Sequence, residues 1–119
     1  MHEYRAKVMA VVDGDTLDVE IDLGFEVATH QRIRLFGINC PEKNTQAGRD
    51  ARQFAIDWIT ANGPDFILRT VKDTRGTDKR EKYGRYLGHL YNATGTAPLN
   101  FALVDAGLAT FYDGTGPRI

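Results

Sequence analysis

The chain has 119 residues, of which 42% are hydrophobic and 26% are charged. This length favours a single domain over residues 1–119, and the composition is typical of a globular protein that dissolves in water. No apolar segment approaches the length of a membrane-spanning helix, and the single cysteine, Cys40, excludes an intrachain disulfide. Because no signal peptide is visible at the N-terminus either, we expect a cytoplasmic protein, with a secreted mature form as the alternative.

The net charge of −1 hides an uneven distribution of charged residues. Residues 69–85 carry seven Lys and Arg against three Asp and Glu, a local charge of +4, and the rest of the chain carries −5. Such a basic stretch can steer a polyanion to one place on the surface. A solvated loop would have the same composition, so charge alone leaves both interpretations open.

Three strands are predicted in the first third of the chain, over residues 4–12, 16–22 and 27–38. Asp13-Gly14 is a hairpin signal, because glycine accepts a positive φ and aspartate bonds its own backbone. In residues 16–22 apolar and acidic side chains alternate after the first position, which predicts one buried face. The same period places Arg34 on the opposite face from Ile33, so Arg34 is expected to leave the core.

Two helices and two further strands are predicted after Pro41. Apolar residues recur at helical spacing over residues 47–61, and Asn62-Gly63-Pro64 ends that helix. Strands are expected over residues 66–71 and 86–91, joined by the basic stretch as a loop or an extended hairpin connection. A second helix is expected over residues 99–108, with Asn100 as its N-terminal cap and Gly107 at its C-terminal end. Residues 113–119 contain two glycines and a proline, and we expect a loose tail there.

Five strands with one helix between the third and the fourth follow the order of an OB-fold barrel. The predicted fold class is therefore α+β and mainly β, a five-stranded OB-fold-like barrel with two packed helices. Strand order alone also suits other small α+β folds.

Several charged residues suit the hydrolysis of a phosphodiester. That reaction needs a water molecule in line with the leaving oxygen and positive charge around the phosphate. Arg34 and Arg85 suit the second task, because a guanidinium stays protonated and offers a planar fork to two phosphate oxygens. Glu42 suits the first task, because a carboxylate can orient or deprotonate the water.

Four sequence blocks together resemble the staphylococcal nuclease (thermonuclease) family. They are DGDT at residues 13–16, RLFGINCPE at 34–42, KYGR at 82–85 and LVDAGLA at 103–109. The resemblance covers nearly the whole chain, with the blocks in the family's order. It implies an OB-like barrel with helices packed beside it, and calcium-dependent cleavage of DNA and RNA without preference for the sugar. The expected partner is DNA, RNA or both. The lack of a long apolar segment predicts no membrane, and no obligate protein partner is evident.

The resemblance also implies roles for individual residues. Arg34, Glu42 and Arg85 would be catalytic, with Glu42 as the general base. The calcium ligands would be the Asp15 carboxylate, the Asn39 side chain and the backbone carbonyl of Cys40, since calcium takes several oxygen ligands. Lys82 and Tyr83 would hold a terminal phosphate or stack near the nucleotide. Asp113 falls near where the family presents aromatic residues to the base, and the adjacent Tyr112 would substitute there.

Each of these residues also has a structural interpretation. Asp15 can simply stabilise a turn, Arg34 can pair with a carboxylate on the sheet, and Glu42 after a proline can simply be exposed. The Cys40 side chain is expected to be a buried apolar group, and the three histidines lack metal-ligand spacing.

The sequence departs from the family pattern at Asn39, where the family places an aspartate, and at Cys40, where it places a threonine. Losing the aspartate removes a negative charge from the metal ligands. A catalytically weak or silent OB-type module that binds nucleic acid or a protein is therefore the alternative function.

Overall fold

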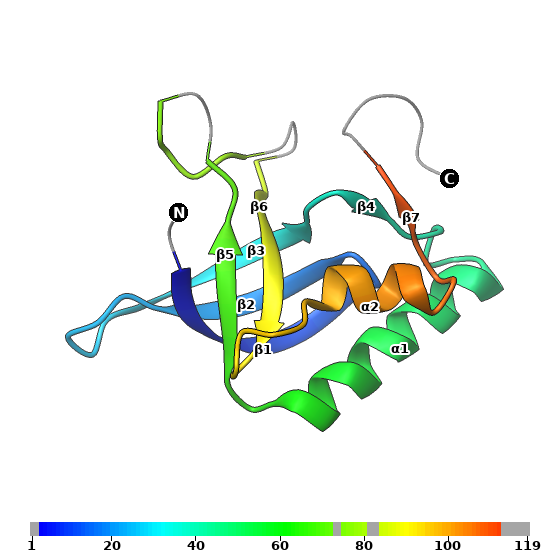
Figure 1. Ribbon diagram of the computed structural model, residues 1–119, viewed down its shortest axis with the longest axis horizontal. Coiled ribbons are helices and arrows are strands. Elements are labelled where there is room, and N and C mark those ends of the chain that lie inside the picture. The colour runs from blue at the N-terminus through cyan, green and yellow to red at the C-terminus, as the bar shows by residue number, and fades with distance from the viewer. Residues whose placement is uncertain (1–2, 73–74, 81–83, 113–119) are drawn as a thin grey trace.

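The structure is a computed structural model that describes residues 3–72, 75–80 and 84–112 (Figure 1). Within these residues the elements are, in chain order, β1 (Glu3–Asp13), β2 (Thr16–Asp22), β3 (Ala28–Leu35), β4 (Ile38–Asn39), α1 (Gln46–Asn62), β5 (Phe66–Thr70), β6 (Tyr86–Asn92), α2 (Leu99–Asp105) and β7 (Thr110–Phe111). The predicted loose tail, residues 113–119, lies outside the described residues.

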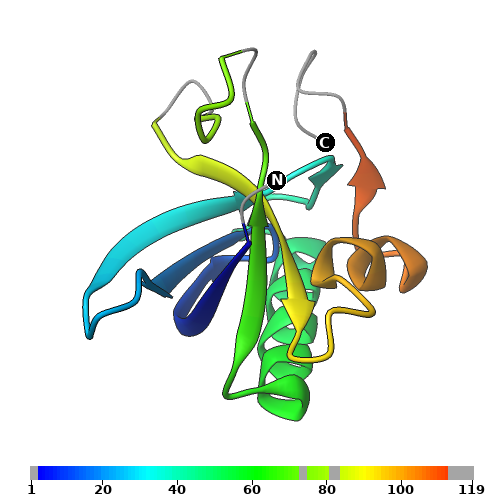
Figure 2. The same cartoon turned by 60° about the vertical axis from the view of Figure 1, so that its left-hand side comes forward.

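Five strands close into a barrel in the order β1-β2-β3-β6-β5. β3 and β6 run parallel, and the other neighbours in the barrel are antiparallel. Figures 1 and 2 show α1 packed across the barrel and α2 lying beside β6. The predicted mainly-β OB-like barrel with two helices is therefore confirmed.

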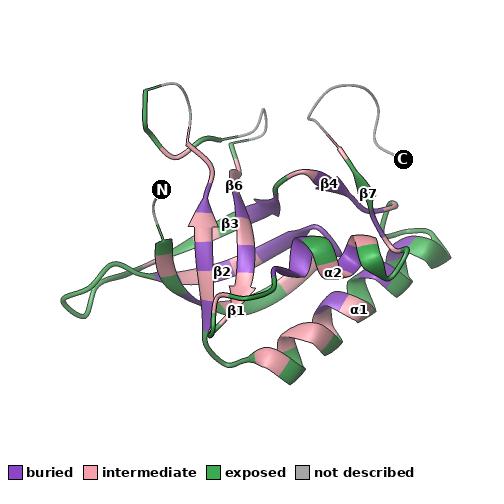
Figure 3. Cartoon of the chain, viewed as in Figure 1, coloured by how far each residue is buried: buried purple, intermediate pink, exposed green. Residues whose placement is uncertain are grey.

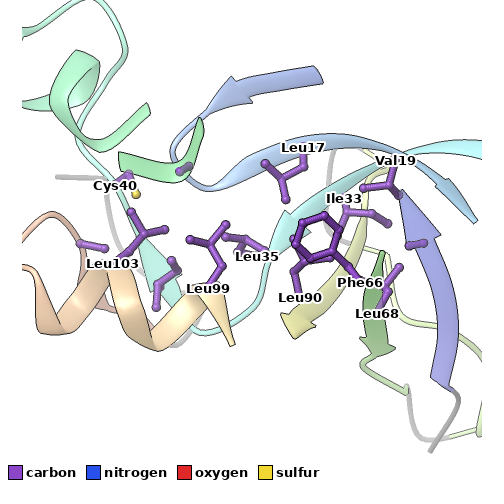
Figure 4. Packing of buried hydrophobic residues seen from close by; sticks show 14 of the residues in the cluster. Leu17, Val19, Ile33, Leu35, Cys40, Phe66, Leu68, Leu90, Leu99 and Leu103 are labelled. Carbon is purple, nitrogen blue, oxygen red and sulfur yellow. The ribbon is translucent and has the colours of Figure 1, made fainter. Parts of the chain in front are cut away.

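The core has one part inside the barrel and another between the barrel and the helices (Figure 4). Alternation along the strands supplies the first part, as the burial pattern of β2 and β5 shows (Figure 3). Its labelled members are Leu17, Val19, Ile33, Phe66, Leu68 and Leu90. Leu35, Leu99, Leu103 and Cys40 continue the core toward the helices, so the predicted burial of the Cys40 side chain is confirmed.

The helix α1 begins and ends close to the predicted boundaries. Thr45 is its N-terminal cap, with Oγ1 accepting a hydrogen bond from the Gly48 amide at 3.0 Å. Its last residue, Asn62, precedes the predicted Gly63-Pro64 stop. No helix in the described part of the chain is long and apolar enough to cross a membrane.

The predicted third strand is wrong at its end. β3 stops at Leu35, because the chain turns at Phe36 and at Gly37, whose φ of +80° an L side chain rarely adopts. Ile38 and Asn39 then form β4, which pairs with β7 in a separate two-stranded sheet. Two residues per strand give too short a pattern for sequence analysis to detect.

The second predicted helix is also longer than the observed one, because α2 ends at Asp105. Gly107, expected at the end, does follow there with a φ of +76°. The expected cap is wrong: Pro98 is the N-terminal cap residue, and the Asn100 side chain is fully buried. Asn100 instead accepts from the Leu90 amide at 3.2 Å and donates to the carbonyls of Phe36 at 2.9 Å and Gly88 at 3.2 Å. It therefore joins α2 to the line where β3 and β6 separate.

Candidate active site

The hairpin turn between β1 and β2 and the end of β3 bring several predicted site residues together. The turn places Asp15 where β4 folds back, and β4 supplies Asn39. A Cβ built on Gly14 would lie 2.9 Å from the Cys40 sulfur and 2.9 Å from the Ala51 Cβ, so the turn packs closely against β4 and α1. Residues distant in sequence thus form one buried polar group.

Arg34 is only 9% exposed, which corrects the expectation that it leaves the core. It does lie on the opposite face from Ile33, but the turn at Gly37 brings β4 over that face. Its Nη1 donates to the carbonyls of Leu35 at 3.0 Å and Ile38 at 2.9 Å. The guanidinium therefore anchors the backbone that leads into β4.

Asp15 is fully buried and accepts hydrogen bonds on both carboxylate oxygens. The Cys40 amide donates to Oδ2 at 3.0 Å, and the Thr16 hydroxyl donates to Oδ1 at 3.2 Å. Arg34 Nη2 lies 3.6 Å from Oδ2, so an opposite charge compensates the buried carboxylate. The interpretation of Asp15 as a turn residue and its predicted role as a metal ligand both suit this geometry.

Asn39 is 1% exposed and is bound through its carbonyl oxygen. Oδ1 accepts from Arg34 Nη2 at 2.6 Å, whereas Nδ2 is buried without a hydrogen-bond partner. A guanidinium only donates, so the oxygen must face Arg34. The amide nitrogen that remains has no lone pair to offer a cation, and the predicted ligand role of Asn39 gains no support from this arrangement.

Asp13 is a polar residue whose importance sequence analysis missed. Its Oδ1 is buried and has no hydrogen-bond partner. A buried oxygen without a donor is costly unless a cation or water satisfies it. The DGDT block contained the signal, but we interpreted its first aspartate only as a turn former.

Glu42 is exposed and its position is set by its backbone. Its carbonyl accepts from the Thr45 amide at 3.0 Å and from the Thr45 hydroxyl at 2.6 Å. The loop passes so close to α1 that a Cβ on Gly48 would lie 1.7 Å from that carbonyl oxygen. Glu42 is thus an exposed residue that follows Asn39 of the buried group by three residues.

Arg85 and Tyr112 approach the same group from later elements. Arg85 Nη1 donates to Thr16 Oγ1 at 3.4 Å, and Thr16 in turn contacts Asp15. The Arg34 guanidinium carbon lies 5.7 Å from the centre of the Tyr112 ring, and the Tyr112 amide donates to the Gly37 carbonyl. The predicted phosphate-binding or stacking residues Lys82 and Tyr83 lie outside the described residues.

Part of the basic stretch is fixed to the barrel by Asp78. This carboxylate accepts from Tyr4 at 3.2 Å, from Thr70 at 2.5 Å and from Lys72 at 2.5 Å. Although burial opposes it, the hydrogen bonds of Lys72 and Thr70 hold the pKa of Asp78 below its ordinary value. Lys72 is therefore a paired, half-buried cation, and Arg75, Lys79 and Arg80 are the exposed ones among the described residues.

The donors of this group suit a hard cation in part. Asp13 and Asp15 offer buried carboxylate oxygens, one of them without a partner, and calcium prefers such ligands. Among the residues that the structure describes, however, no three His, Cys, Asp or Glu side chains form a metal-binding cluster. Backbone carbonyls, water or substrate oxygens would have to complete the coordination.

Comparisons with known proteins give the same family as the sequence blocks. Residues 32–118 match the model of the family described as "Staphylococcal nuclease homologue". This match spans more than half of the chain, and the chain belongs to that family.

Individual relatives carry names of different kinds. "Protein ParB" of Escherichia coli is 32% identical over 117 residues, which are 92% of this chain and 58% of that protein. An "Uncharacterized endonuclease" of Escherichia coli O157:H7 is 32% identical over 112 residues, covering 93% of this chain and 63% of its own length. "Micrococcal nuclease" of Shigella flexneri is 29% identical over 118 residues, covering 92% and 59%. The chain thus spans about three-fifths of the length of these relatives.

Proposed function

We propose that this chain is a calcium-dependent, sugar-nonspecific endonuclease that hydrolyses phosphodiester bonds of DNA, RNA or both. The observation that carries the proposal is a connected set of polar contacts: Arg85 donates to Thr16, Thr16 donates to the Asp15 carboxylate, and that carboxylate forms an ion pair with Arg34 at 3.6 Å. Two guanidinium groups and a buried carboxylate are thereby gathered, and the exposed Glu42 follows Asn39 of the same group by three residues. Family membership and two relatives with nuclease names support the same reaction.

In this proposal each residue performs a separate task. Glu42 orients and deprotonates the attacking water, and Arg85 neutralises charge on the phosphate oxygens in the transition state. Arg34 supplies fixed positive charge, because both Nη1 hydrogens are already donated to carbonyls. Tyr112, Lys82 and Tyr83 contact the nucleotide.

Asp13 and Asp15, with the Cys40 carbonyl, would hold the calcium ion. When bound, the ion supplies positive charge beside the reacting phosphate. Asn39 stands where the family pattern has an aspartate ligand. It would instead serve to orient Arg34, since its side-chain oxygen accepts a hydrogen bond from that guanidinium.

One observation favours the silent module as the second candidate. Arg34 donates three hydrogen bonds to protein acceptors, so its planar fork is not open toward a phosphate. Nicking of supercoiled plasmid with calcium, and its loss in EDTA, would support the nuclease. Binding of the same plasmid without nicking at any calcium concentration would support the silent module.

Glu42→Gln is expected to lower the cleavage rate by about two to four orders of magnitude, as for the loss of a general base. The fold should persist, because the backbone of Glu42 rather than its side chain is tied to Thr45. Initial rates of plasmid nicking at saturating calcium measure the effect. Lys43→Gln, which changes a neighbouring exposed charge, is the control, and equal rates for the two variants would remove Glu42 from the mechanism.

A further inference from the structure

The outer face of β6 leads from the candidate active site to a group of exposed rings. Gly88 and Leu90 are buried in the barrel, so Leu87, His89 and Tyr91 lie on the outer face and are half buried. Arg85 precedes them with the same parity. The strand thus has an arginine at one end of its outer face and aromatic side chains at the other.

Five rings on β6 and its neighbours contact one another, and we name them the aromatic strip. Phe36 and His89 lie with their ring centres 5.6 Å apart, and His89 lies 6.3 Å from Phe101. Phe101 meets Phe111 at 6.3 Å, and His89 meets Tyr91 at 6.4 Å. Figures 1 and 2 show how this is possible, because α2 lies beside β6 and β7 follows directly after α2.

The aromatic strip is open to solvent. Phe36 is 37%, Phe101 48% and Phe111 71% exposed. Burial lowers the pKa of His89, with a further contribution from the charge of Arg69, so its ring is neutral at neutral pH. Rings left in water at tilted and edge-on angles have faces available to a ligand, and water is a poor environment for them.

The strip is continuous with the candidate active site. In the parallel pairing of β3 with β6, Arg34 stands opposite Leu87, and Phe36 follows two residues later. On the other side, Phe111 directly precedes Tyr112, whose ring lies 5.7 Å from the Arg34 guanidinium carbon. A chain whose phosphate lies at Arg85, near the fixed charge of Arg34, therefore reaches the rings without leaving this surface.

Arg69, which is ion-paired with Glu3, lies at the far end of the strip. The Arg69 guanidinium carbon lies 4.3 Å from the centre of the Tyr91 ring. From Arg85 to Tyr91 the strand advances six residues, about 20 Å at about 3.3 Å per residue. Positive charge at the Arg85 end, followed by aromatic rings along the strand, suits a short polyanion that carries planar groups.

We propose that the aromatic strip binds the unpaired bases of a single-stranded nucleic acid whose phosphate lies at the candidate active site. This inference rests on the proposed function, because Arg85, aided by the fixed positive charge of Arg34, supplies the anchor for the phosphate. Bases of a single strand have free faces that stack on aromatic side chains without regard to sequence, whereas bases in a duplex are stacked on one another. The strip therefore confers a preference for single-stranded substrate.

The test is the affinity for a fluorescein-labelled 12-nucleotide oligo(dT), measured by fluorescence anisotropy in EDTA so that no cleavage intervenes. The variant is Phe101→Ala with Phe111→Ala, which removes the two most exposed rings of the strip. We expect its dissociation constant to rise at least about ten-fold, as for the loss of base stacking. Phe25→Ala is the matched control, since Phe25 is 100% exposed at the tip of the β2–β3 hairpin, and its affinity should stay within about two-fold of the parent protein.

A second measurement uses the unaltered chain. Oligo(dT) with one 5-iodouracil, crosslinked by ultraviolet light, should attach to rings of the strip, identified by peptide mass spectrometry. Unchanged affinity in the double variant, or crosslinks only outside the strip, would overturn the inference. So would a parent protein that forms dimers which the same substitutions dissociate, because the strip would then be a contact between copies.

The two proposals fail in different ways. If the parent protein cleaves neither plasmid nor oligonucleotide with calcium, the proposed function fails, while the EDTA binding data still test the strip. If cleavage proceeds and the double variant binds and cleaves oligo(dT) like the parent, only the strip fails. If both proposals hold, the double variant should lose affinity for oligo(dT) but retain cleavage of a dinucleotide, which is too short to reach the rings.

Discussion

Arg34 shows how one side chain can act on both structure and charge. Its parity was predictable from the sequence, but its burial was not, because that depends on the turn at Gly37 and on β4 folding back. The same guanidinium compensates the negative charge of the buried Asp15 and donates a hydrogen bond to the Asn39 side-chain carbonyl. The pairing of polar atoms within a buried group depends on three-dimensional contacts, which is why sequence analysis named Arg34, Asp15 and Asn39 but missed Asp13 and the way in which these atoms pair.

Asn39→Asp is expected to tighten calcium binding by roughly ten-fold or more, about 1.4 kcal/mol. The substitution leaves one oxygen for Arg34 and replaces the unpartnered amide nitrogen with a second, negatively charged oxygen. In metal-free buffer the variant should be less stable, because another buried carboxylate then lies close to Asp15. Calorimetric titration with calcium and thermal melts with and without calcium measure both effects. Unchanged calcium affinity would mean that this side chain does not face the ion.

The pKa of His89 predicts how stability varies with pH. Burial lowers this pKa below the ordinary value of 6.5, with help from Arg69, so the unfolded chain takes up a proton at higher pH than the folded protein. Below about pH 6.5 the unfolded state therefore binds more protons, and the free energy of unfolding falls as the pH is lowered through this range. In His89→Phe that contribution should vanish, which urea unfolding at pH 7.5, 6.0 and 5.0 would measure. Parallel pH profiles for the two proteins would contradict the prediction.

At the scale of elements, the long periodic segments were predictable and the short ones were not. The alternation in β2 and the helical period in α1 gave nearly the observed bounds, because each side chain's environment repeats with the backbone geometry. β4 and β7 have two residues each and exist only because they pair with each other. Asn100 was misinterpreted as a cap for a similar reason, since its three backbone partners lie far away in the sequence.

Gly48→Ala is expected to lower activity about 100-fold, the loss that follows when a catalytic group moves by about 1 Å. Alanine favours helix by about 1 kcal/mol over glycine, but its Cβ would lie 1.7 Å from the Glu42 carbonyl oxygen. The loop that carries Glu42 must therefore move. Cleavage rates and urea unfolding of this variant, beside the exposed Gln53→Ala on the same helix, measure the effect. A Gly48→Ala protein that is both more stable and fully active would show that the loop has room to adjust.

At the scale of the whole molecule, the predicted order of strands and helices was compatible with several small α+β folds, and the four sequence blocks were needed to favour the OB-like barrel that the structure has. Charge asymmetry predicted a basic stretch but not how its residues are used. Asp78 accepts hydrogen bonds from Lys72 and from Tyr4 and Thr70 of the barrel, so these contacts fix the stretch to the barrel. A count of charges cannot separate such paired cations from those open to a polyanion.

The buried amide of Asn100 has a consequence for how the barrel comes together. It satisfies three backbone groups, on Leu90, Gly88 and Phe36, at the line where β3 and β6 part. Without this side chain those groups would lose a partner, and unpaired strand edges are templates for pairing with other chains. Asn100 thus protects the barrel from association through this edge.

Asn100→Ala removes the side chain that satisfies these three backbone groups. We expect a loss of about 2–4 kcal/mol in the free energy of unfolding, because buried backbone groups lose their partners. The Leu90 amide should exchange its hydrogen with solvent much faster, and light scattering should reveal association at concentrations where Asn44→Ala, altered at an exposed position, stays monomeric. Unchanged exchange at Leu90 would mean that water satisfies these backbone groups as well as Asn100 does. The barrel would then not depend on α2 for protection against pairing with other chains.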